Sequence, residues 1–142
     1  MKRVLIDTNV VLDVLLERKP HLAASAAIWD VVESGGAEGY LAAHAITTIH
    51  YLAQKQLGAR RAKRVIASLL QVFEVAAVDG NVLRDALQYE THDFEDAVSE
   101  AAAQAIACEA IVTRDPKGFR AAGLPVLTPE AAVPLLAATL DL

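Results

Sequence analysis

Three aspartates, far apart in the chain, lie where a folded α/β domain could bring their carboxylates together. Asp7 directly follows the short apolar run 4–6, and Asp115 closely follows a second such run, 111–113, while Asp96 lies at the start of a predicted helix. Clustered carboxylates repel one another and raise one another's pKa, but a hard cation such as Mg²⁺ or Mn²⁺ reverses that interaction. Because bound metal generates hydroxide from water and stabilises charge on a phosphoryl oxygen, phosphodiester hydrolysis is the chemistry that fits best.

Each acid also has a simpler interpretation. Turns favour aspartate, so Asp7 and Asp115 could merely begin turns. Asp93 and Asp96 could cap a helix and interact favourably with its dipole. Capping does not account for Glu100, which shares a helix face with both of these acids at the spacing i, i+3, i+7. The opposite stripe of this helix is expected to supply its packing: Ala97, Val98, Ala101, Ala105 and Ile106.

The elements that must position these acids alternate along the chain. Strands are predicted at 3–6, 39–41, 73–78, 110–113 and 125–127, and helices at 10–18, 22–34, 46–57, 59–71, 81–90, 93–107 and from Thr128 onwards. This alternation favours a mainly parallel sheet covered by helices on both faces. Ligands of such sheets collect beyond the carboxyl ends of the strands. Because no repeat, low-complexity tract or linker interrupts the pattern, residues 1–142 are expected to form one α/β domain.

Composition places the chain among globular proteins. Of its 142 residues, 54% are hydrophobic and 22% charged, which is enough apolar surface for a sizeable core. No apolar run approaches the roughly 18 residues of a membrane span, and the run after Arg3 is too short for a secretory signal. The lone Cys108 permits no internal disulfide, so a cytoplasmic protein is expected. Neither zinc-ligand spacing nor a glycine-rich phosphate loop is present.

The net charge of −5 argues against general electrostatic capture of nucleic acid. One dense basic run stands out: Arg60, Arg61, Lys63 and Arg64. It could be a solvated helix face, a phosphate contact or a surface for an acidic protein partner. Arg114 and Lys117 flank Asp115 and could contact RNA phosphate, although surface solvation explains them equally well.

Three motifs resemble a known family. Residues 5–10, Leu-Ile-Asp-Thr-Asn-Val, resemble the opening of PIN domains, especially the VapC-type toxins of bacterial toxin–antitoxin pairs. Residues 93–97, Asp-Phe-Glu-Asp-Ala, and 111–115, Ile-Val-Thr-Arg-Asp, are similar to the two later motifs of the family, in the same order and at suitable separations. The similarity covers essentially the whole chain.

The resemblance implies a parallel-sheet α/β/α sandwich and the activity of a metal-dependent endoribonuclease, the toxin of a type II toxin–antitoxin pair. It implies RNA as substrate, Mg²⁺ or Mn²⁺ as cofactor, and two partners, a cognate antitoxin and a second copy of the chain. Asp7, Asp96 and Asp115 would be the catalytic, metal-binding acids, and Asp93 is a further candidate metal ligand that could equally be a cap. Supporting hydrogen bonds would come from Asn9 and Thr113.

One position departs from the family pattern. Many members carry a glutamate on the helix after the second strand, where this chain has Thr48. A related branch of the family looks similar to this sequence, with Thr-Thr in that stretch, so the departure does not by itself imply a dead enzyme. Losing one carboxylate predicts weaker metal binding, a one-metal site or a site completed by substrate phosphate. His50 lies two residues away and is predicted to face a different side of the helix.

Two other functions are weighed against the nuclease. A catalytically silent module that binds RNA or a protein partner would fit the missing glutamate and the acidic net charge. Phosphotransfer through Asp7 as a nucleophile fits poorly, because the haloacid-dehalogenase pattern needs a second aspartate two residues later and this chain has Asn9.

Overall fold

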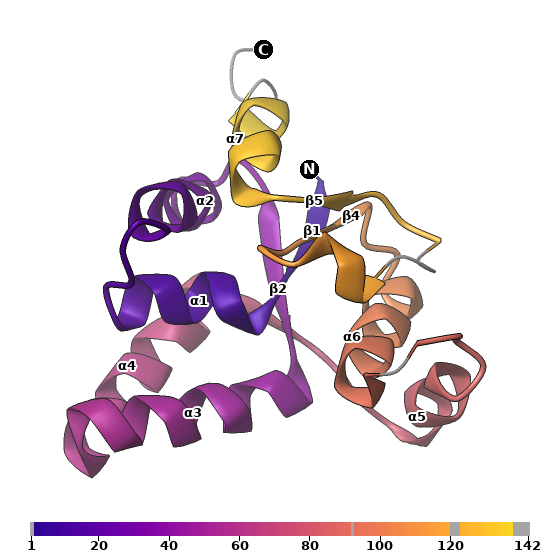
Figure 1. Cartoon of the computed structure of the whole chain (residues 1–142), viewed down its shortest axis with the longest axis horizontal. Helices are drawn as coiled ribbons and strands as arrows, with labels where there is room; N and C mark the ends of the chain where they lie inside the picture. Colours follow the sequence, from indigo (N-terminus) through magenta and orange to yellow (C-terminus); the bar gives the residue numbers. More distant parts are fainter. Residues whose placement is uncertain (1, 92, 120–122, 138–142) are drawn as a thin grey trace.

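The computed structural model describes residues 2–91, 93–119 and 123–137, which form one parallel sheet between two layers of helices (Figure 1). The strands are β1 (Arg3–Ile6), β2 (Glu38–Ala42), β3 (Glu74–Ala76), β4 (Ala110–Val112) and β5 (Val126–Leu127). They lie in the order β3-β2-β1-β4-β5, and every neighbouring pair is parallel. The predicted α/β/α sandwich with a parallel sheet is confirmed.

The helices follow the predicted order. They are α1 (Thr8–Leu15), α2 (Leu22–Glu33), α3 (Ala43–Leu57), α4 (Ala59–Val72), α5 (Gly80–Ala86), α6 (Phe94–Ala105) and α7 (Pro129–Ala137). A 3₁₀ turn, η1 (Pro116–Phe119), was not predicted. No helix in the described part of the chain is long and apolar enough to cross a membrane.

Several element bounds differ from the prediction for local reasons. The first helix begins at Thr8 rather than at Val10, because the Asp7 side chain accepts a hydrogen bond from the Thr8 backbone N–H and caps the helix there. It ends at Leu15, two residues before Glu17 adopts a positive φ of 50°. The third strand is three residues long instead of six, since it lies at the edge of the sheet and pairs with β2 alone.

The sheet buries both of its faces, which is why its central strands are continuous apolar runs. In β1, Val4 and Ile6 belong to a core shared with α1, α2, α4 and α7, whereas Leu5 belongs to a second core shared with α5 and α6. In the first core, Trp29 meets Phe73 edge to face with ring centroids 5.0 Å apart. Trp29 is therefore a packing residue of this core.

More residues of helix α6 are buried than the predicted apolar stripe contains. Ala97 to Ala103 form an unbroken buried run, because α5, the sheet and η1 surround this helix. The prediction that Ala105 packs was wrong, since its side chain is exposed at the last turn of the helix. Conversely Glu100, on the predicted acidic face, is only 3% exposed.

Candidate active site

Asp7 lies at the carboxyl end of β1 and is held from three directions. Its backbone N–H donates to the Val112 carbonyl at 2.9 Å, which fixes it beside the end of β4. Its Oδ1 accepts from the Thr8 N–H at 2.9 Å and its Oδ2 accepts from the Thr113 hydroxyl at 2.7 Å. Both oxygens of this carboxylate are thereby oriented without help from a cation.

The Thr113 hydroxyl is the centre of a network that joins the ends of β1 and β4. It donates to Asp7 and accepts from the Asp115 N–H at 3.0 Å and from Asn9 Nδ2 at 3.2 Å. The Asn9 side-chain carbonyl in turn accepts from the Arg114 N–H at 3.2 Å. Asn9 and Thr113 thus make hydrogen bonds of the kind expected of supporting residues, while their part in activity stays a prediction.

Asp96 and Asp115 approach one another beside Gly118. A Cβ atom added to Gly118 would lie 2.6 Å from Asp96 Oδ2 and 3.8 Å from Asp115 Oδ2, so both carboxylates border the space that this glycine leaves empty. Gly118 belongs to the unpredicted turn η1, which carries it from the end of β4 against the start of α6. The turn therefore brings two of the predicted acids to one place.

Asp93 caps α6. Its Oδ1 accepts from the Asp96 N–H at 3.2 Å, the hydrogen bond of an N-cap residue. Its contacts show the simpler interpretation of this residue, and its role as a metal ligand stays a prediction.

The electrostatics of Asp96 link all of these acids. Burial is the largest cause that raises the pKa of Asp96, and the negative charges of Asp7, Asp93, Asp115 and Glu95 add to it, so that the pKa reaches about 7. A bound divalent cation would oppose both causes, because it favours the charged form of a buried carboxylate that lies among like charges.

Asp7 is affected in the same direction. Burial raises its pKa, while the hydrogen bonds from Thr113 and Thr8 lower it and the charges of Asp115 and Asp93 raise it. The net effect is upward. Desolvation and repulsion by like charges therefore outweigh two well-formed hydrogen bonds at this position.

Oxygen donors dominate the site, which suits Mg²⁺ or Mn²⁺ rather than zinc. Within the described ranges, however, no three His, Cys, Asp or Glu side chains lie close enough together to form a ready-made metal cage. The structure therefore brings Asp7, Asp96 and Asp115 within each other's electrostatic reach and leaves the coordination itself a prediction.

The helix α3 contributes a residue that sequence reasoning missed. His44 Nε2 lies 3.2 Å from the Glu95 carbonyl in the first turn of α6 and 3.5 Å from the Ser99 hydroxyl. Its buried Nδ1 has no hydrogen-bond partner among the residues that the structure describes. The available signal was its place two residues after a strand end. Thr48, four residues later, lies on the same face of α3 and is half-buried.

The two cations expected to contact RNA differ in their surroundings. Arg114 Nε lies 2.6 Å from Asp13 Oδ2, and Asp13 is fully buried and also accepts from the Ser25 hydroxyl at 2.9 Å. Arg114 therefore has a structural ion-pair partner that the sequence did not suggest. Lys117 is exposed in η1, one residue before Gly118. Its contact with RNA stays a prediction.

Metal-free protein is expected to lose stability as the pH rises from about 4 to about 7. Folded Asp96 keeps its proton up to a pKa of about 7, whereas an unfolded chain releases it near 4. The folded state binds more protons in this window, so the free energy of unfolding falls with rising pH and stays level above it. Asp7 acts in the same direction.

Melting temperatures measured in chelator on both sides of that window check this expectation. The Asp96→Asn variant should show a smaller drop, and added Mg²⁺ should raise the melting temperature more on the alkaline side. An equal drop in parent and variant would show that Asp96 is not the responsible group.

Together the fold and the acids define an α/β/α protein with an acidic site at the carboxyl edge of a parallel sheet. The PIN domain family model matches residues 3–117, and the chain belongs to this family. No curated protein matches it.

Solved structures share the fold at low sequence identity. A chain of FitAB bound to a DNA fragment is 23% identical with a TM-score of 0.71, covering 89% of this chain and 94% of that one. DNA-bound VapBC from Salmonella typhimurium is 16% identical with a TM-score of 0.71, covering 91% and 99%. VapC20 from Mycobacterium tuberculosis, described as a Sarcin-Ricin loop cleaving toxin, is 16% identical with a TM-score of 0.62, covering 76% and 86%.

Proposed function

We propose that this protein is a metal-dependent endoribonuclease of the VapC type and the toxin of a type II toxin–antitoxin pair. The observation that carries the proposal is the convergence of acids from three distant segments: Asp96 and Asp115 border one space beside Gly118, and the Thr113 hydroxyl joins Asp7 to the Asp115 backbone N–H. Membership of the PIN domain family supports it, as do the similar folds of FitAB, of VapBC and of the Sarcin-Ricin loop cleaving toxin VapC20.

In this proposal Asp7, Asp96 and Asp115 hold the cation, Mg²⁺ or Mn²⁺. The bound ion would supply a water of lowered pKa and would stabilise charge on the phosphoryl oxygen. The chain's own part is orientation: the Thr113 hydroxyl fixes Asp7 Oδ2, and its contact with the Asp115 N–H fixes the end of β4 beside it. Thr48 in place of an acid favours a single cation, with substrate phosphate completing its ligands.

The proposal extends to partners and location. The substrate is RNA, and a cognate antitoxin and a second copy of the chain bind the protein in the cytoplasm. A short reading frame for a DNA-binding antitoxin beside this gene would support the toxin role independently of any enzyme assay.

A catalytically silent module is the second candidate. It is favoured by Thr48 and by the fact that no three described acids form a finished cage. Such a protein would bind RNA equally well with and without metal and would turn nothing over.

One experiment separates the two candidates. Purified protein free of antitoxin is incubated with structured and unstructured RNAs in Mg²⁺, Mn²⁺, Ca²⁺ or chelator. We expect cleavage in Mg²⁺ or Mn²⁺ and none in chelator, because the carboxylates alone supply no activated water at neutral pH. Metal binding without cleavage of any RNA would refute the enzyme.

A further inference from the structure

The charges of this protein are divided between two parts. Residues 43–73, which comprise α3 and α4, contain five of the thirteen Lys and Arg residues and none of the eighteen Asp and Glu residues. This α3–α4 hairpin therefore carries +5, whereas the rest of the chain carries −10. The five cations are all exposed: Lys55, Arg60, Arg61, Lys63 and Arg64. A local basic surface on an acidic protein can attract a polyanion that the net charge would not.

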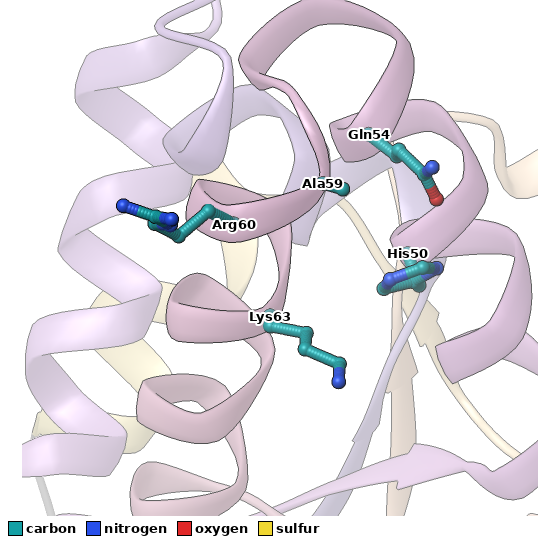
Figure 2. A pocket seen from close by; sticks show the side chains of 5 residues that line it. All are labelled: His50, Gln54, Ala59, Arg60 and Lys63. Atoms are coloured by element: carbon teal, nitrogen blue, oxygen red, sulfur yellow. The ribbon is translucent and has the colours of Figure 1, made fainter.

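A pocket of about 510 Å³ lies between the two helices of the hairpin. It is lined by His50 and Gln54 from α3 and by Ala59, Arg60 and Lys63 from α4. Figure 2 shows Lys63 extending into the space between the helices, towards His50, while Arg60 extends from the other side of α4. Four of the five lining side chains can donate hydrogen bonds, which suits a phosphate group.

An exposed aromatic ring lies on α3, one residue after the pocket residue His50. Tyr51 is 59% exposed on α3, and the Lys55 Nζ lies 4.9 Å from its ring centroid. Residues 51 and 55 form the row of α3 next to the pocket residues 50 and 54. An aromatic face beside a cationic groove is the combination with which proteins bind single-stranded nucleic acid, by stacking on bases and pairing with phosphates.

Helix α3 connects this surface to the candidate active site. Its first turn places His44 against the start of α6, and the hairpin extends away from the carboxyl edge of the sheet (Figure 1). From His44 to Gln54 the helix spans about 15 Å, the length of about four stacked nucleotides. Helix α3 therefore leads from its contact with the start of α6 to the pocket.

We propose that the outer face of the α3–α4 hairpin binds the phosphate backbone of single-stranded RNA that leads to the cleavage site. The pocket takes a phosphate, and Tyr51 stacks on a base. This inference rests on the proposed ribonuclease function and names the substrate-binding surface of the same enzyme. A protein partner is disfavoured, because the centres of protein interfaces are depleted of charge and this pocket is lined by cations and donors.

The test compares two double variants that each remove two exposed cations. Arg60→Gln/Lys63→Gln changes the pocket, and Lys19→Gln/Arg84→Gln is the matched control outside the hairpin. The affinity for a labelled single-stranded RNA of about 16 nucleotides is measured in chelator over a range of salt. We expect the pocket variant to bind about ten-fold more weakly with a salt slope lower by about 1.4, since each phosphate contact to a single strand contributes about 0.7, and the control to resemble the parent.

Two further measurements make the outcome specific. In Mg²⁺, the pocket variant should have a higher KM than the parent and the same kcat. Tyr51→Ala should weaken RNA binding about five-fold, whereas Tyr51→Phe should not, because phenylalanine keeps the stacking ring. Unchanged RNA affinity and salt slope in the pocket variant would overturn the inference. Binding of a polyglutamate peptide, but of no RNA, by the parent protein would overturn it as well. If the parent cuts no RNA, the ribonuclease proposal fails, while the binding series in chelator still decides whether the hairpin holds RNA.

Discussion

Replacing Asp7 by asparagine is expected to reduce RNA cleavage at least about 100-fold, the scale on which metal-site groups act. Asparagine removes one negative charge from the acid cluster and presents an N–H₂ group where the Thr113 hydroxyl now donates to Asp7 Oδ2. The fold should persist, because asparagine caps helices as well as aspartate does and can still accept from the Thr8 N–H. Cleavage rates in Mg²⁺ and circular dichroism spectra of the two proteins check the expectation.

Asp30→Asn is the matched control, since it removes the same charge from an exposed position on α2. It should leave cleavage within two-fold of the parent, as expected for surface changes. Equal activity of the Asp7→Asn protein would remove Asp7 from the metal site. A folded, inactive protein that still binds RNA in chelator would separate catalysis from binding.

Replacing Gly118 by alanine is expected to lower cleavage by about 10- to 100-fold, as the loss of supporting groups at metal sites does. The new Cβ would meet Asp96 Oδ2 at 2.6 Å, which is closer than such atoms can approach. The Asp96 carboxylate must rotate away and leave the space that it shares with Asp115. The backbone tolerates alanine because Gly118 has no positive φ, so stability should change little.

Gly80→Ala is the comparison variant. The atom nearest to its Cβ, at 3.2 Å, would belong to the guanidinium of Arg84, at the far end of an exposed side chain of α5. The Gly80→Ala protein should cleave RNA at the rate of the parent. The Gly118→Ala protein should also need more Mg²⁺ for half-maximal cleavage, whereas full activity in it would show that the carboxylate of Asp96 works from another position.

The sequence by itself predicted the layered fold and the identity of the acids. Apolar runs such as 4–6 and 111–113, separated by helical stripes, suffice to predict a parallel sheet, because strands buried on both faces must be apolar throughout. The positions of Asp7 and Asp115 follow from the same pattern, since Asp7 comes directly after β1 and Asp115 three residues after β4, and both strands end at the carboxyl edge of the sheet.

Only the tertiary structure decided how these residues meet. Gly118 reaches Asp96 through a 3₁₀ turn with no periodic signal, and Asp13 is buried because Arg114, 101 residues later, supplies its counter-charge. The position of His44 against α6 and the basic pocket between α3 and α4 likewise result from contacts between helices. Local sequence patterns predict which face of a helix or strand is apolar. They do not predict which distant side chain will lie beside a given atom, and the chemistry of a site depends on these long-range neighbours.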